Sequence, residues 1–136
     1  MNVYLRNSLA VIFGWLSGSV LNMGLVQAGH IIYPINGIDP NNLEALKAVL
    51  PNLDIQFFIF PFLAHSLGTL LGAIVAGTIA KTHKVKFSFL IGLLFFIGGV
   101  MVNMMIGGPI WFIVLDLSLA YFPMAWIATK IIKKTN

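Results

Sequence analysis

The sequence consists of four long apolar stretches separated by short polar segments. The clearest stretch, residues 57–80, contains no Asp, Glu, Lys or Arg and carries one histidine, His65, near its middle. A helix needs about 20 apolar residues to cross the hydrocarbon core of a bilayer. Gly68, Gly72 and Ala76 follow His65 at spacings of three or four, which places them on the same helical face. The pattern predicts a membrane-spanning helix with one small-residue face and a lipid-facing side of Leu, Ile and Phe.

The same reasoning predicts three further spans. We expect an all-α integral membrane protein, a four-transmembrane-helix bundle that forms a single membrane domain over residues 1–136. The expected spans are residues 4–29, 55–80, 87–106 and 110–132. The first is longer than the apolar part of a signal peptide, about 7–15 residues, which favours a retained helix. Pro61 and Pro123 are expected to bend or loosen the second and fourth spans.

The one substantial loop joins the first two spans at residues 30–54. Asp39 followed by Pro40 is typical of a helix start, with the carboxylate as N-cap and proline at the first helical position. Leucines spaced three and four apart between residues 43 and 50 share one face. We expect a short amphipathic helix at about residues 40–50 that lies on the membrane surface over the outer mouth of the bundle.

Composition agrees with a membrane protein. Hydrophobic residues make up 59% of the 136-residue chain and charged residues 9%, with a mean hydropathy of +0.95. Soluble domains usually contain about 25% charged residues. The sequence has no cysteine, which excludes disulfide frameworks and thiolate metal sites.

The distribution of charge predicts the orientation. Seven of the eight Lys and Arg residues fall at the N-terminus, in the turn at 81–86 and in the C-terminal tail, whereas Lys47 lies in the opposite loop with three acidic residues. Cytoplasmic loops of membrane proteins carry the excess of Lys and Arg. We therefore expect a multi-pass protein of the bacterial inner-membrane type with both termini cytoplasmic. Its expected partner is the lipid bilayer, and no nucleic acid.

Polar residues occur in the outer half of several spans. Asp116 lies about 10 Å from the outer end of its span at ~1.5 Å per residue. A carboxylate at the bilayer centre costs about 2.5–3.5 kcal/mol and should face the bundle interior. His65 is the other ionisable side chain at comparable depth, so we predict that the two are close, as an ion pair or a shared-proton hydrogen bond. The predicted pocket for a ligand, ion or proton comprises Asp116, His65, Asn22, Asn103 and Gln27.

Small residues on the same faces are expected to let the helix backbones approach closely. The candidate packing positions are Gly14, Gly18, Gly68, Gly72 and Gly99. The pattern Gly-x-x-x-Asn-Met occurs at residues 18–23 and again at 99–104. This match is compatible with a parallel duplication of a helical hairpin and equally with chance in glycine-rich sequence.

Two classes of function remain open. In the first, the chain is a small transporter, channel or ligand-binding protein with an outward-facing polar pocket for a small solute or cation, with or without proton coupling. A histidine can exchange a proton near physiological pH, Asp116 would supply the compensating charge, and a transporter of this size would work as a homo-oligomer. In the second, the chain is a structural or accessory membrane protein whose glycine faces bind a partner and whose polar network is scaffolding.

An enzyme is the least favoured class, and no catalytic residue is assigned. Ser66 follows His65 directly, but adjacent helical residues point about 100° apart, so they should not form a nucleophile–base pair. The three histidines lack the spacing of a metal site. We expect no cofactor and no bound metal.

Overall fold

The chain is all-helical, without strands, over residues 1–135, which the computed structural model describes. Four helical segments are long and apolar enough to span a membrane, as predicted. The first is α1 (Val3–Ile32), and the second consists of the 3-10 turn η2 (Ile55–Phe58) and α3 (Ile59–Ile79). The third is α4 (Lys84–Ile106), and the fourth is divided into α5 (Ile110–Leu119) and α6 (Phe122–Thr135).

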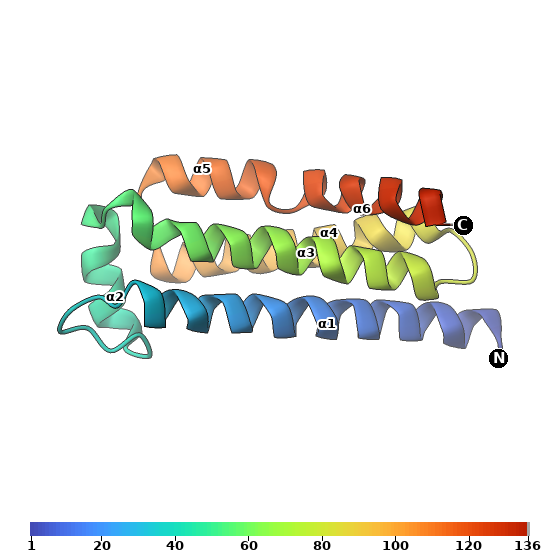
Figure 1. The fold of residues 1–136 in the computed structure, drawn as a ribbon, viewed down its shortest axis with the longest axis horizontal. Coiled ribbons are helices and arrows are strands. Elements are labelled where there is room, and N and C mark those ends of the chain that lie inside the picture. Colours follow the sequence, from blue (N-terminus) through green and yellow to red (C-terminus); the bar gives the residue numbers. More distant parts are fainter. Residues whose placement is uncertain (136) are drawn as a thin grey trace.

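The four long segments lie side by side, and α3 is in contact with α1, α4 and α6 (Figure 1). α1 lies on one side of α3 and α4, and the α5–α6 pair lies on the other. Successive segments run in opposite directions, so both termini lie at one end of the bundle and α2 lies at the other. The apolar part of α3 is the most buried of the four. This central position explains why residues 57–80 have the most extensive small-residue face.

Glycines set the distance between α1 and α3. A Cβ atom added at Gly14 would lie 2.7 Å from the carbonyl oxygen of Gly72, and one added at Gly18 would lie 2.5 Å from that of Gly68. A side chain at either position would force the two backbones apart, so only glycine permits this approach. The two contacts are four residues apart on both helices, about one turn. The antiparallel helices therefore pack closely over successive turns. On α1 the contact positions are four residues apart, Gly14 and Gly18, and Asn22 is the next position at this spacing.

Gly99 has a similar role between α4 and the fourth span, since a Cβ atom there would collide with the ring of Tyr121. All five predicted packing glycines thus face another span of the same chain. The small-residue faces that sequence reasoning offered to a partner protein are already covered within the bundle.

The fourth span is broken in its middle. α5 ends at Leu119 and α6 begins at Phe122. In a continuous helix the ring of Pro123 would collide with the carbonyl group of Leu119, four residues earlier. The predicted loosening at Pro123 is confirmed. Pro61 lies in the first turn of α3 and does not interrupt it, because a first-turn proline removes no intrahelical hydrogen bond. The second span changes from the 3-10 turn η2 to α3 just before Pro61, so any loosening at this proline is confined to the end of the span near α2.

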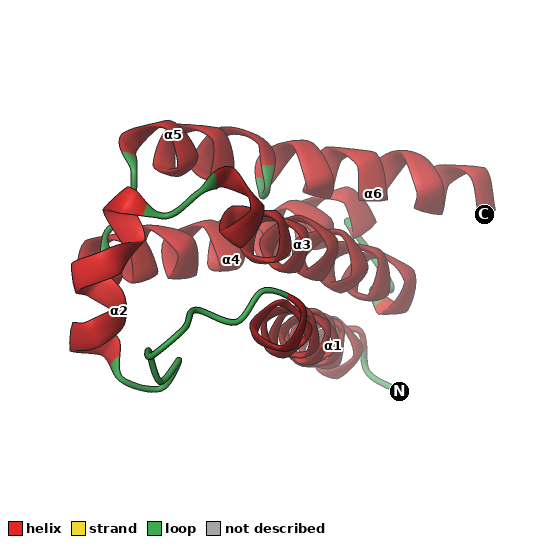
Figure 2. Cartoon of the chain, turned by 60° about the vertical axis from the view of Figure 1, so that its left-hand side comes forward, coloured by secondary structure: helices red, strands yellow, loops and turns green. Residues whose placement is uncertain are grey.

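The loop after α1 contains the short helix α2 (Leu43–Val49) and the 3-10 turn η1 (Leu50–Asn52). These elements cross the end of the bundle opposite the termini (Figure 2). The helix is shorter than the predicted 40–50.

The start of α2 also differs from the prediction. Its N-cap is Asn42, whose side chain accepts a hydrogen bond from the backbone N–H of Ala45. The carboxylate of Asp39 instead accepts one from the N–H of Asn41 within the preceding turn. The assignment of Asp39 as N-cap was therefore wrong. Asp39 and Asn42 both favour caps and turns, and the sequence alone did not separate the two positions.

Candidate functional site

The predicted contact between His65 and Asp116 is present. Nδ1 of His65, on α3, lies 2.9 Å from both carboxylate oxygens of Asp116, on α5. The Asp116 side chain is fully buried and that of His65 is 17% exposed. The only carboxylate inside the long helices is therefore paired, as its cost in apolar surroundings requires.

Tyr121 completes a group of three that sequence reasoning missed. Its hydroxyl donates a hydrogen bond of 2.9 Å to Oδ2 of Asp116. Its ring stacks on the His65 imidazole, with ring centroids 5.9 Å apart and an interplanar angle of 28°. In a continuous helix, residues five apart point about 140° away from each other. The break between α5 and α6 brings Tyr121 back to Asp116, and Pro123 was the signal that could have found it.

The protons of this group determine what it offers to a ligand. A proton lies between Nδ1 of His65 and the carboxylate, because the lone pairs of the nitrogen and the oxygen would otherwise repel each other at 2.9 Å. A second proton on the histidine makes the pair neutral, and a net buried charge is costly. In this neutral state Nε2 carries its hydrogen. We infer that Asp116 and Tyr121 orient the imidazole so that Nε2 is its free edge.

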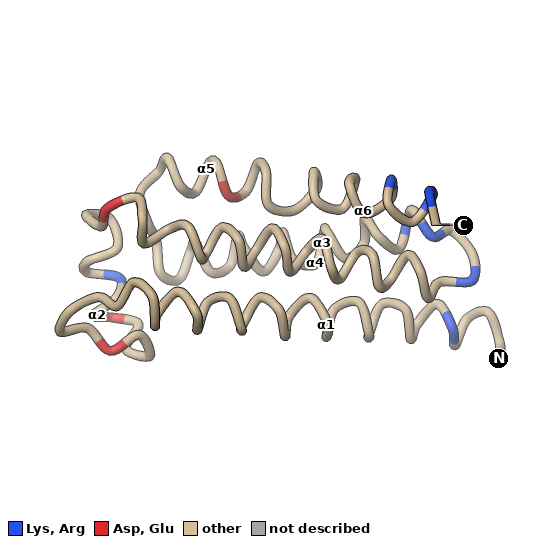
Figure 3. The backbone as a smooth tube through the Cα atoms, viewed as in Figure 1, with Lys and Arg blue, Asp and Glu red and all other residues tan. Residues whose placement is uncertain are grey.

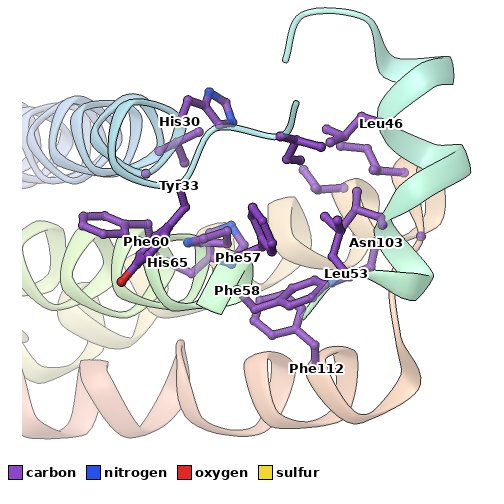
Figure 4. A pocket seen from close by; sticks show the side chains of 18 residues that line it. His30, Tyr33, Leu46, Leu53, Phe57, Phe58, Phe60, His65, Asn103 and Phe112 are labelled. Carbon is purple, nitrogen blue, oxygen red and sulfur yellow. The ribbon is translucent and has the colours of Figure 1, made fainter. Parts of the chain in front are cut away.

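A cavity of about 190 Å³ leads from the α2 end of the bundle to His65 (Figure 4). Its walls are mostly apolar. Of the α3 residues that line it, His65 lies farthest from the α2 end. Leu46, Leu50 and Leu53 close the α2 side. The wall contains the aromatic side chains of Tyr33, Phe57, Phe58, Phe60 and Phe112. Besides His65, the side chains of His30 and Asn103 add polar groups to the wall.

The remaining predicted pocket residues are placed differently from one another. Asn103 lines this cavity, and its amide donates to the carbonyl of Gly99. Asn22 does not line it, but it shares a second cavity with His65. Gln27 is exposed and lines neither cavity. The structure thus brings three of the other four residues to His65 and leaves Gln27 outside, and the walls are less polar than expected.

Ser66 is buried and does not face the imidazole. Its hydroxyl donates to the carbonyl of Leu63, one turn earlier in α3. Thr69 donates to the backbone carbonyl of His65 in the same way. Both hydroxyls satisfy their own helix, so the arrangement offers a hydrogen-bonding histidine without an adjacent nucleophile.

Comparisons with known proteins were made for the whole chain. A scan against protein-family models, a search of curated proteins and a search of solved structures each find no match.

Proposed function

We propose that the chain crosses a bacterial-type cell membrane four times, with both termini in the cytoplasm. The four long apolar segments support membrane insertion. Charge supports the orientation: Lys and Arg gather at the end that holds both termini, whereas Asp and Glu gather near α2 (Figure 3). Two residues are exceptions: Asp116 lies on α5, and Lys47 lies on α2. Excess Lys and Arg favour the cytoplasmic side.

A single cysteine introduced at an exposed position reports this orientation, because the chain has none of its own. Lys86→Cys is expected to react with a membrane-impermeant maleimide in inverted vesicles only, and Glu44→Cys in right-side-out vesicles only. Both positions are exposed in the structure. The reverse pattern would show that the termini lie outside.

We propose further that the chain is a membrane-embedded binding protein, or a carrier, for a small and largely apolar ring compound with one polar group. The observation that carries this proposal is the oriented imidazole of His65 at the inner end of an aromatic-walled cavity. Ligand sites typically combine apolar walls with a few fixed polar groups. An inert packing role for His65 would not need an open volume beside the imidazole.

The size of the cavity limits the ligand. Sites for drug-sized molecules occupy about 300–1,000 Å³, whereas an apolar cavity of about 150 Å³ holds one benzene molecule. The volume of about 190 Å³ therefore suits a single ring with a few substituent atoms. The apolar walls also make the site unsuitable for an alkali cation, which would exchange its hydration shell for few ligands. The sequence left open a small solute or a cation; the size and apolar walls of the cavity favour a neutral, lipid-soluble molecule.

The accessory role has less support. Its expected docking surfaces were the glycine faces, and these are occupied inside the bundle. A scaffold also needs no cavity. The His65–Asp116–Tyr121 group contributes to helix packing in either role, so the ligand experiment is the one that separates them.

Two matched probes test the binding proposal: 4-fluorophenol, and fluorobenzene, which lacks the hydroxyl. We expect 4-fluorophenol to raise the thermal unfolding midpoint of the detergent-purified protein more than fluorobenzene does. A ligand at one hundred times its Kd adds about 2.7 kcal/mol to the free energy of unfolding. The control is His65→Asn, whose amide can still donate to Asp116 but which lacks the Nε2 edge.

In His65→Asn the advantage of 4-fluorophenol over fluorobenzene should shrink, because the hydroxyl loses the hydrogen bond to Nε2. Two results would contradict the proposal. One is that neither probe stabilises the wild type. The other is that 4-fluorophenol keeps its full advantage in His65→Asn, which would place its hydroxyl elsewhere.

A further inference from the structure

A second cavity, of about 200 Å³, lies between α1 and α4. Trp15, Ser19 and Asn22 line it from α1, and Gly98 is among the residues that line it from α4. His65 and Tyr121 form its inner wall. This cavity thus reaches the same imidazole as the cavity that leads from the α2 end, which we call the outer cavity, but it does so from the side of the bundle.

Asn22, which lines this cavity, carries an unexplained polar atom. Oδ1 of Asn22 is buried and has no hydrogen-bond partner, and among residues 1–135 it is the only buried side-chain oxygen or nitrogen in that condition. A buried acceptor without a donor costs about 1–3 kcal/mol. Such atoms are rare in native structures and call for an explanation. A bound molecule that donates a hydrogen bond to Oδ1 would explain why this atom has no partner within the chain.

His65 and Val102 line both cavities, and Asn22 lines the second one together with His65. A hydroxyl group placed in the second cavity therefore has both His65 and Asn22 in the wall around it. Nε2–H of His65 is a donor and Oδ1 of Asn22 is an acceptor. A hydroxyl group is both, so it can satisfy the two protein atoms together. A carbonyl or ether oxygen can satisfy only the histidine.

The second cavity also opens sideways. Trp15 is 50% exposed and Val102 is 43% exposed. A Cβ atom added at Gly98 would meet no atom within 4 Å. In a chain that spans a membrane as proposed, this side of the bundle faces lipid tails rather than water.

We propose that the cavity between α1 and α4 is a hydroxyl-binding subsite and the entrance for the ligand from the lipid. The ligand is then a lipid-soluble alcohol or phenol, whose hydroxyl donates to Oδ1 of Asn22 and accepts from Nε2 of His65. This inference rests on the proposed binding function and specifies its ligand class and route. The outer cavity holds the ring.

The test measures the dissociation constants of 4-fluorophenol and fluorobenzene by ¹⁹F NMR with protein in lipid nanodiscs, with protein-free nanodiscs as the blank. Asn22→Leu removes the acceptor and keeps the size of the side chain. It is expected to weaken 4-fluorophenol binding about 2- to 10-fold, the usual range for one hydrogen bond, and to leave fluorobenzene unchanged. Without ligand the variant should be at least as stable as the wild type, because the unpaired atom is gone. A variant that is less stable and binds both probes as before would show that Asn22 is structural.

Gly98→Phe tests the entrance. The added ring has space next to the α4 backbone and should fill the side opening, so we expect the association rate of both probes to fall at least tenfold. Gly24→Phe is the matched control, since it lies on α1 away from both cavities and also has no neighbour within 4 Å. Equal association rates in the wild type and Gly98→Phe would overturn the lateral route.

The failures of the two proposals can be told apart. If neither probe binds the wild type, the binding function is wrong and this inference falls with it. If both probes bind, and His65→Asn reduces the preference for the phenol while Asn22→Leu does not, the binding function stands and the subsite does not.

Discussion

Replacing His65 by leucine is expected to lower the free energy of unfolding by about 3 kcal/mol, measured by reversible unfolding in detergent. Removing one partner of a buried ion pair usually costs about 3–5 kcal/mol, because the other is left without compensation. Asp116 is fully buried and would keep only the hydroxyl of Tyr121. Because this hydrogen bond remains, the expected loss lies at the lower end of that range.

Two controls isolate the pair. His65→Asn retains a donor toward Asp116, so its loss should be clearly smaller. The triple variant His65→Leu/Asp116→Leu/Tyr121→Phe should recover most of the stability, since it replaces the whole buried group, including the hydroxyl that donates to Asp116, by apolar side chains. A loss below about 1 kcal/mol in His65→Leu, or a triple variant less stable than His65→Leu, would show that the group is not a buried unit.

Replacing Gly14 by leucine should have an effect of similar size for a different reason. The first side-chain atom alone would lie 2.7 Å from the backbone oxygen of Gly72. Backbone cannot rotate away as a flexible side chain can, so α1 and α3 must separate. We expect a loss of about 3 kcal/mol, the upper part of the range for overpacking, in the same unfolding measurement.

Gly24→Leu is the matched control, because it lies on the same helix with no atom within 4 Å of the added Cβ. It should be neutral or stabilise the protein by up to about 1 kcal/mol through the better helix propensity of leucine. Similar losses at both positions would mean that the glycines act through backbone flexibility. The close contact between α1 and α3 would then not be what they provide.

The four long helices could be predicted because length and apolar composition are sufficient signals for them. The His65–Asp116 contact could also be predicted, since a buried carboxylate needs a partner and the sequence offers one at similar depth. The packing glycines follow from their spacing of four, which places Gly14 and Gly18 on one face of α1 and Gly68 and Gly72 on one face of α3.

What the sequence did not reveal depends on geometry outside regular helices. Tyr121 reaches Asp116 because the helix is broken between them, and a regular helical projection separates the two. Gln27 has a polar side chain like the other predicted pocket residues, but it lies on an exposed side of α1. The cavity walls come from the ends of several helices and from α2, so their apolar character emerges only when those ends are brought together.

The central claim is that Asp116 holds Nδ1 of His65 while Nε2 contacts a hydroxylated ring compound. Histidine ¹⁵N NMR of labelled protein in nanodiscs tests it most directly, with the His65 signals identified by their absence in His65→Asn. Saturating 4-fluorophenol is expected to shift the Nε2 resonance and to leave Nδ1 nearly unchanged, whereas fluorobenzene should shift neither. An Nε2 resonance that does not respond to 4-fluorophenol, or responds equally to fluorobenzene, would contradict it.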